Sequence, residues 1–129
     1  MLRNYRYENG LDVHEYLDKG MINIAENKKF NWKKEGVAFA KTMGMLMDSV
    51  GKDAFFKNRR FSLAMYEFIT LGLSRAIENS SKTLGAKFVR ERVAKVPMLP
   101  EAQRYSGIGV RGTQRLASFV VPMAERFFA

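Results

Sequence analysis

The chain has 129 residues, 47% of them hydrophobic, which is enough for one domain with a buried core. Its 22 Lys and Arg outnumber 13 Asp and Glu, and the net charge of +9 favours nucleic acid, anionic lipid or an acidic protein as partner, with an ordinary solvated surface as the alternative. The lack of cysteine excludes disulfides, thiolate zinc sites and a cysteine nucleophile. Because no signal peptide or run of 18 apolar residues occurs, we expect a cytoplasmic protein that does not enter the membrane.

Two helices are predicted in the N-terminal region. The first covers residues 11–27, and Asp12 can cap it. The second covers 31–50, where apolar residues recur at intervals of three and four, Asn31 can cap the first turn and Gly51 can end the helix.

A short connector, GKDAFFKNRR, joins the 31–50 helix to a third helix over 61–79 with the same apolar spacing. The connector ends in an exposed basic segment, Asn58-Arg59-Arg60. We expect the 31–50 and 61–79 helices to form the middle of the core. The residues predicted to be buried in them are Phe39, Met43, Leu46, Phe68 and Ile69.

A further helix is predicted over 81–96, and Pro97 and Pro100 should end it because proline cannot donate within a continuing helix. One of its sides is apolar. The opposite side carries Lys82, Lys87, Arg90, Arg92 and Lys95. Such a basic side can lie along nucleic-acid phosphates, or it can simply be a solvated face.

The last part of the chain is predicted as a loop over 97–112, with a helical turn at 101–105, and a final helix over 112–128. Pro122 lies inside that helix and should kink it by freeing the carbonyl near Ser118. No segment alternates with period two between turn signals. The expected fold is therefore a single all-α domain over 1–129, a bundle of about five helices without a sheet.

Three stretches together resemble a known family: DVHEYLDKGM, MDSVGKDAFFKNRRFSLAMYEFITLGLS and SGIGVRGTQRLASFVVPMAERFF. They are similar to the helical region of the GmrSD-type family, whose members are restriction proteins that defend bacteria against phage. The family is otherwise described as a domain of unknown function. In that family the helical region follows a ParB-like domain that hydrolyses nucleotides. The resemblance implies that this chain is the helical part of a larger defence protein, as a fragment or as a separate subunit.

The chemistry of the resembled family lies in an acidic-Gly-Gln-Gln-Arg type motif of the ParB-like domain. No such motif occurs in this chain, so no catalytic residue is carried over. The resemblance implies a non-catalytic module that contacts DNA or a partner subunit, with the missing ParB-like domain or another protein as its partner. Two alternatives stay open: a free-standing nucleic-acid-binding protein, and a structural interaction domain for an acidic partner.

A glycine pattern, G-x-G-x-x-G, occurs at Gly107, Gly109 and Gly112, directly before the final helix. A dinucleotide site is excluded, because no strand precedes the pattern and the chain ends before the acidic residue such a site needs. The loop and its arginines can instead hold a phosphate, or form an ordinary surface loop. The candidate nucleic-acid or anion-binding residues are Arg104, Arg111, Thr113, Arg115, Arg90, Lys95, Arg59 and Arg60.

No catalytic, cofactor or metal site is predicted. His14 is the only histidine, and the acidic residues near it are spread around the first helix, so we expect it to be a surface residue. Enzymatic activity of the chain alone is not expected, because no catalytic arrangement can be built from one histidine and no cysteine.

Overall fold

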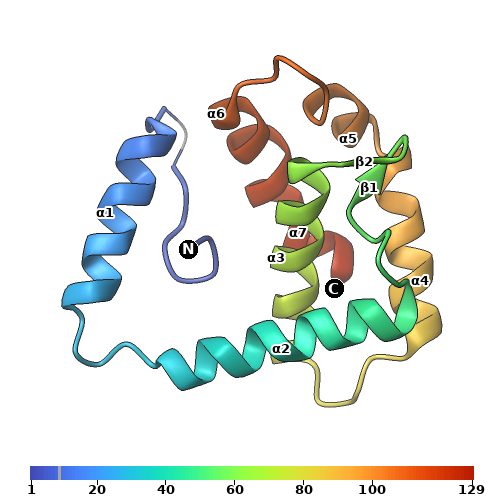
Figure 1. Ribbon diagram of the computed structural model, residues 1–129, viewed down its shortest axis with the longest axis horizontal. Helices are drawn as coiled ribbons and strands as arrows, with labels where there is room; N and C mark the ends of the chain where they lie inside the picture. Colours follow the sequence, from blue (N-terminus) through green and yellow to red (C-terminus); the bar gives the residue numbers. More distant parts are fainter. Residues whose placement is uncertain (9) are drawn as a thin grey trace.

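A computed structural model describes residues 1–8 and 10–129 and shows a mostly helical protein. The described chain has six helices and one small hairpin (Figure 1). The helices are α1 (Val13–Glu26), α2 (Trp32–Ser49), α3 (Leu63–Asn79), α4 (Ala86–Lys95), α5 (Pro100–Tyr105) and a continuous last helix made of α6 (Gly112–Arg115), η2 (Leu116–Val120) and α7 (Val121–Phe128). A 3-10 turn, η1 (Val96–Met98), joins α4 to α5, and the hairpin consists of β1 (Phe56–Lys57) and β2 (Arg60–Phe61).

The mainly helical prediction is confirmed, but two details of it were wrong. The sixth helix is α5, where only a turn was predicted, and the expected absence of a sheet is contradicted by β1 and β2. These strands pair antiparallel, with Phe56 opposite Phe61. A strand of two residues is too short to show the period-two alternation on which the prediction depended.

The hairpin closes over a two-residue turn with left-handed backbone. Asn58 has φ of 52° and Arg59 has φ of 63°. Two successive positive φ values are typical of the type I′ turn, whose twist matches that of the paired strands. Asparagine accepts this conformation readily, whereas arginine does so rarely. The basic segment predicted at 58–60 is therefore the tip of a hairpin.

Side-chain caps fix where three of the helices begin. Asp12 accepts a hydrogen bond from the Glu15 amide at 3.1 Å, and Asn31 accepts one from the Lys34 amide at 2.8 Å, as the sequence predicts. Ser62 caps α3 in the same way. In contrast, α4 begins at Ala86 and not at 81, after a Gly85 that provides no side-chain cap.

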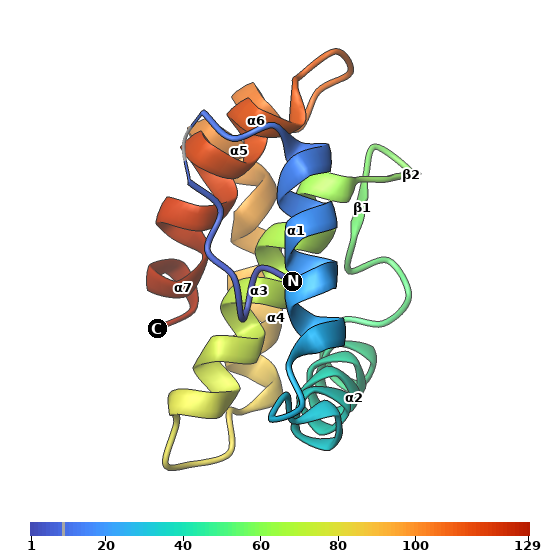
Figure 2. The ribbon, with the colours of Figure 1, turned by 90° about the vertical axis from the view of Figure 1, so that its left-hand side faces the viewer.

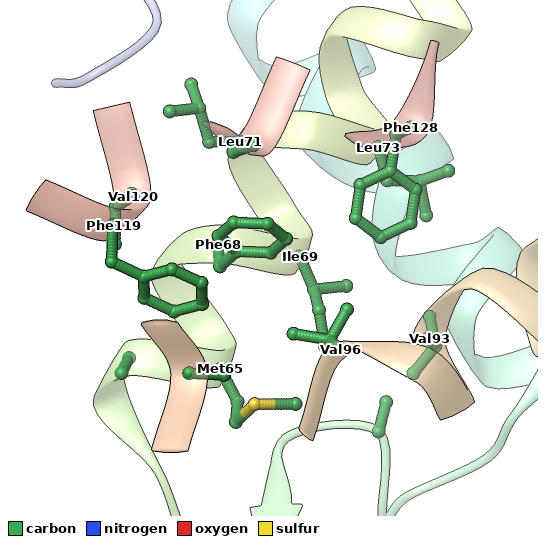
Figure 3. Close-up of a cluster of buried hydrophobic side chains, with 14 of the residues drawn as sticks. Met65, Phe68, Ile69, Leu71, Leu73, Val93, Val96, Phe119, Val120 and Phe128 are labelled. Atoms are coloured by element: carbon green, nitrogen blue, oxygen red, sulfur yellow. The ribbon is translucent and has the colours of Figure 1, made fainter. Parts of the chain in front are cut away.

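The core is centred on α3 (Figure 3). Phe68, Ile69 and Leu46 are fully or almost fully buried, as predicted. Phe68 stacks on Phe119 of the last helix, with ring centroids 4.3 Å apart. Gly72 lies directly against the backbone of Ala124, so close that an added Cβ would stand 2.4 Å from the carbonyl oxygen. The glycine thus lets α3 and α7 approach closely, and they form the central pair of the fold.

The prediction that α2 shares the middle of the core was wrong. Phe39 is 59% exposed, and Met43 is only half buried. Figures 1 and 2 show α2 crossing the end of the other helices instead of running along α3. A crossing helix buries only a narrow face. In α2 this face consists of Thr42, Leu46 and Ser49.

Pro122 is accommodated by a widened turn. Proline has no amide hydrogen, so the carbonyl of Ser118 cannot be bonded in the usual way. The residues before it, Leu116–Val120, adopt π-helical geometry, and the Val121 amide donates to the Leu116 carbonyl five residues back. The irregularity predicted near Ser118 thus takes the form of a π turn within a helix that continues to Phe128.

The N-terminal segment lies between α1 and the rest of the molecule (Figure 1). Arg3 binds Glu35 of α2 at 3.1 Å and Glu78 of α3 at 3.3 Å. On the other side of the segment, the Tyr16 hydroxyl of α1 donates to the Tyr5 carbonyl. The segment therefore links α1 to the core helices. None of the helices in the described part of the chain has the length and apolar character that crossing a bilayer requires.

Candidate nucleic-acid interface

A groove of about 590 Å³ lies between the hairpin, the start of α3 and the loop that follows α5. In Figure 1, α5 and the start of this loop lie above β2. The groove places the basic hairpin beside the glycine-rich loop, and of the arginines predicted around that loop only Arg115 lines the groove. Its lining consists of Lys57, Asn58, Arg60, Phe61, Ser62, Leu63, Ala64, Tyr105, Ser106, Gly107, Ile108 and Arg115.

One hydrogen bond ties the two walls of the groove together. The Lys57 ammonium of β1 donates to the Ser106 hydroxyl at 2.8 Å, across 49 positions of sequence. At the base of the hairpin, the Ser62 amide donates to the Phe55 carbonyl at 2.9 Å. These contacts hold the hairpin beside the loop, so the groove is formed by defined walls and not by a single projecting segment.

Three sources of positive potential meet at the groove. Lys57 and the exposed Arg60 are opposite each other in the hairpin. The first amides of α3, a helix of 17 residues, also lie there; Ser62 accepts from that of Met65, and those of Leu63 and Ala64 have no partner within the helix and carry partial positive charge. Like charges placed directly opposite each other repel. An anion bound between them would relieve this repulsion.

Arg115 lines the groove, but its charge is already matched. Its Nε and Nη2 donate to both carboxylate oxygens of Glu67, at 2.6 and 3.1 Å. Both side chains are about five-sixths buried, with 15% and 16% exposed. A two-pronged pair of this kind fixes the last helix on α3 and contributes little net charge to a ligand. Arg115 is therefore mainly a structural residue of this corner.

Of the eight residues proposed from the sequence, all of which the structure describes, Arg60 and Arg115 line the groove. Arg59 is exposed at the hairpin tip, next to it. Arg104 and Arg111 are exposed and outside the groove lining, with the Arg104 guanidinium over the Tyr105 ring. Thr113 is half buried in the first turn of α6 and also outside the lining.

Two of the five basic residues predicted on the fourth helix make internal contacts, and Lys82, Lys87 and Lys95 are exposed. Arg90 donates to the Ser49 carbonyl at the end of α2, at 3.0 Å. Arg92 lies over the rings of Phe88 and Phe127. Lys95 is exposed on the last turn of α4, outside the groove. The structure therefore does not bring Arg90 and Lys95 together with the glycine-rich loop.

The three glycines of the G-x-G-x-x-G pattern have different surroundings. Gly109 has φ of 86°, a conformation that favours glycine in the turn. Gly112 packs on α1, where an added Cβ would stand 3.2 Å from Val13. Gly107 lines the groove beside Ile108, whose side chain is 98% exposed. Gly109 therefore allows the turn, Gly112 allows packing against α1, and only Gly107 contributes to the groove.

Lys57 and Ser106 are groove residues that were not predicted from the sequence. Lys57 directly precedes the Asn58-Arg59-Arg60 segment, and in the run FFKNRR the basic segment was predicted to begin only at Asn58. The available signal was the pair of basic residues on either side of a two-residue turn, which places them opposite each other in a hairpin. No sequence pattern links Lys57 to Ser106.

A second cavity, of about 420 Å³, lies where the N-terminal segment, α1, α2 and α3 meet. Its lining is mainly apolar but includes Arg3, Glu35 and Glu67, which are already paired with each other or with Arg115. Burial raises the pKa of Tyr16, at its edge, to about 12. His14 is exposed, and within the described residues no three His, Cys, Asp or Glu side chains are close enough to hold a metal ion.

Comparisons of this chain with protein families, with curated proteins and with solved structures found no match.

Proposed function

We propose that the chain binds the phosphate backbone of nucleic acid in the groove between the hairpin and the glycine-rich loop, without catalysing a reaction itself. The observation that carries the proposal is the convergence of Lys57, Arg60 and the start of α3 beside loop 106–111, fixed by the bond between Lys57 and Ser106. The overall charge of +9 supports the same class of partner.

Backbone binding fits the chemistry of these groups. Ammonium and guanidinium groups and helix-terminal amides are all donors to phosphate oxygens. Such contacts position a nucleic acid and do not read its sequence. The proposal therefore predicts binding that depends strongly on salt and little on base sequence.

The resemblance to GmrSD-type proteins extends this proposal. In that context the chain would serve as a helical module of a phage-defence restriction system, and the groove would hold DNA near a partner domain that carries the nucleotide chemistry. An in-frame or neighbouring ParB-like coding sequence in the genome would support this extension.

The experiment removes charge from the hairpin while preserving its turn. In the double variant R59G/R60Q, glycine suits the positive φ at position 59 better than arginine does, so the fold should be retained. The matched control K28Q/K29Q removes two charges from the exposed polar loop between α1 and α2. Binding of labelled DNA of two unrelated sequences is measured between about 50 and 200 mM salt by fluorescence anisotropy.

The hairpin variant should bind both sequences more weakly than the parent. Its slope of log affinity against log salt should be smaller by about 0.7 to 0.9 for each phosphate that the variant no longer neutralises. The control should keep a slope close to that of the parent. Equal slopes for the hairpin variant and the control would place the interface elsewhere, and absence of binding by the parent at low salt would exclude the proposal.

A further inference from the structure

The groove combines its basic residues with exposed apolar side chains. Phe61 is 56% exposed, Leu63 is 48% exposed and Ile108 is 98% exposed, and all three line the groove. Phe56, paired with Phe61 across the hairpin, is also 42% exposed. Exposing this much apolar surface at one corner is unfavourable for the free protein, and such patches usually mark a binding surface.

The aromatic rings here are held in place by their neighbours. Phe55 turns inward, half buried against the core, and packs edge-on against Tyr66 with centroids 5.1 Å apart. The Phe61 ring is 6.1 Å from Tyr66 and 6.4 Å from both Phe55 and Phe56. Phe61 is thus supported by three rings and still presents more than half of its surface to solvent. A supported aromatic side chain needs little ordering when a ligand stacks on it.

We infer that this groove takes single-stranded nucleic acid, with a base stacked on Phe61 and the adjoining phosphates bound by Lys57 and Arg60. This inference rests on the proposed function and specifies its ligand class. Arg60 and Phe61 are consecutive residues of β2, and although successive strand residues point to opposite faces, both side chains line the groove.

The combination of basic and apolar side chains in the groove favours single strands over duplexes. A duplex presents phosphates and sugars on its outside and hides the faces of its bases in the stack, so Phe61, Leu63 and Ile108 would meet polar groups. A single strand exposes base faces, and stacking of a base on an aromatic side chain is favourable for every base. A groove with both basic and apolar walls therefore suits a single strand better than a duplex.

The test measures anisotropy of a labelled DNA strand of about 12 nucleotides, within the usual site size for single-strand binding, and of the duplex of the same sequence, at one low salt concentration. The variants are F61L, which keeps apolar volume but removes the aromatic face, F61W, which restores it, and R60Q. The matched control is F39L, since Phe39 is similarly exposed, at 59%, but belongs to α2. Vesicles of phosphatidylcholine with phosphatidylserine are tested in parallel.

The parent should bind the single strand more tightly than the duplex. F61L should weaken single-strand binding by up to about 5- to 150-fold, the range of one stacked base, while F61W and F39L stay near the parent. R60Q should weaken binding to both DNA forms. In F61W, made in a Trp32→Phe background, the single strand should quench the indole fluorescence.

Other outcomes overturn the inference in distinguishable ways. If the duplex binds as tightly as the single strand and F61L behaves as F39L does, the ligand class is wrong while backbone binding stands. If neither DNA form binds the parent, the proposed function itself fails. If F61L reduces binding to anionic vesicles and leaves single-strand binding unchanged, the exposed side chains serve a membrane surface instead.

Discussion

Residues of the same type play opposite roles in this protein, according to where the backbone places them. Arg60 and Arg115 line the same groove, but Arg115 is paired with Glu67 and Arg60 is exposed at the hairpin. Phe68 and Phe39 differ in the same way: Phe68 is fully buried against Phe119, and Phe39 is 59% exposed. The side chain alone does not distinguish these roles.

The phenylalanine pair gives a stability prediction with its own control. Phe68→Ala should lower the free energy of unfolding by about 3 to 5 kcal/mol, because it removes a fully packed ring and leaves a cavity. Phe39→Ala should change the free energy of unfolding by less than about 1 kcal/mol, since the exposed Phe39 ring has few packing contacts. Urea unfolding followed by circular dichroism measures both. Similar losses of stability for the two variants would contradict this assignment of core and surface.

At the scale of the element, the helices differ in whether their packing against a neighbouring helix requires a glycine. Gly72 of α3 has no room for a side chain, since an added Cβ would lie 2.4 Å from the Ala124 carbonyl oxygen and 2.5 Å from Phe128. Gly44 of α2 has nothing within 4 Å of the same position. The packing of α3 on α7 thus depends on a glycine, whereas α2 carries one without a steric need.

Alanine substitutions at these two glycines should therefore have opposite signs. Gly44→Ala should raise the free energy of unfolding by about 0.5 to 1 kcal/mol, because alanine loses less backbone entropy in a helix. Gly72→Ala should lower it, typically by about 1 to 3 kcal/mol, because backbone and a buried ring must move. Thermal unfolding of the two variants beside the parent measures the difference, and a stabilised Gly72→Ala protein would show that the two helices separate easily.

At the scale of the whole molecule, charged side chains attach the N-terminal segment to the core. Arg3 contacts Glu35 and Glu78, and Lys34 and Arg75 also pair with Glu78. Burial alone would raise the pKa of Glu35, but the hydrogen bond and charge of Arg3 outweigh it and hold that pKa below its ordinary value. The hydrogen bond from Lys34, with that from Arg75, holds the pKa of Glu78 below its ordinary value as well, despite some burial.

These depressed pKa values predict that acid weakens the folded protein. The folded state favours the ionised carboxylates, so the unfolded state binds more protons as the pH falls. The stabilisation is fully present above the ordinary carboxyl pKa of about 4.5 and disappears as the pH drops through the lower pKa of the folded state.

The double variant E35Q/E78Q should therefore be less stable than the parent at about pH 7, and its free energy of unfolding should fall less steeply below about pH 5. Urea unfolding at a series of pH values measures this slope. The control Glu26→Gln removes an exposed carboxylate of α1 and should keep the slope of the parent. If E35Q/E78Q also keeps that slope, the network does not contribute to the acid sensitivity.

The sequence by itself determined most of the helices, because their signals are local, but it showed neither α5 as a helix nor the start of α4 at Ala86. Asp12 and Asn31 cap the helices that they were predicted to cap, the apolar spacing identified Phe68 and Ile69 as core, and Pro122 marked an irregular turn. Caps, periodicity and proline all act within one or two turns of the chain, so a sequence displays them directly.

Only the tertiary structure decided which faces of those helices pack against each other. An apolar stripe does not specify its partner, so the spacing in α2 could not show that this helix crosses the others and leaves Phe39 exposed. Likewise, the pairing of Arg115 with Glu67 spans 48 positions and that of Lys57 with Ser106 spans 49. Pairing between side chains so far apart in the sequence depends on how the chain folds back, so the sequence alone could not show the groove.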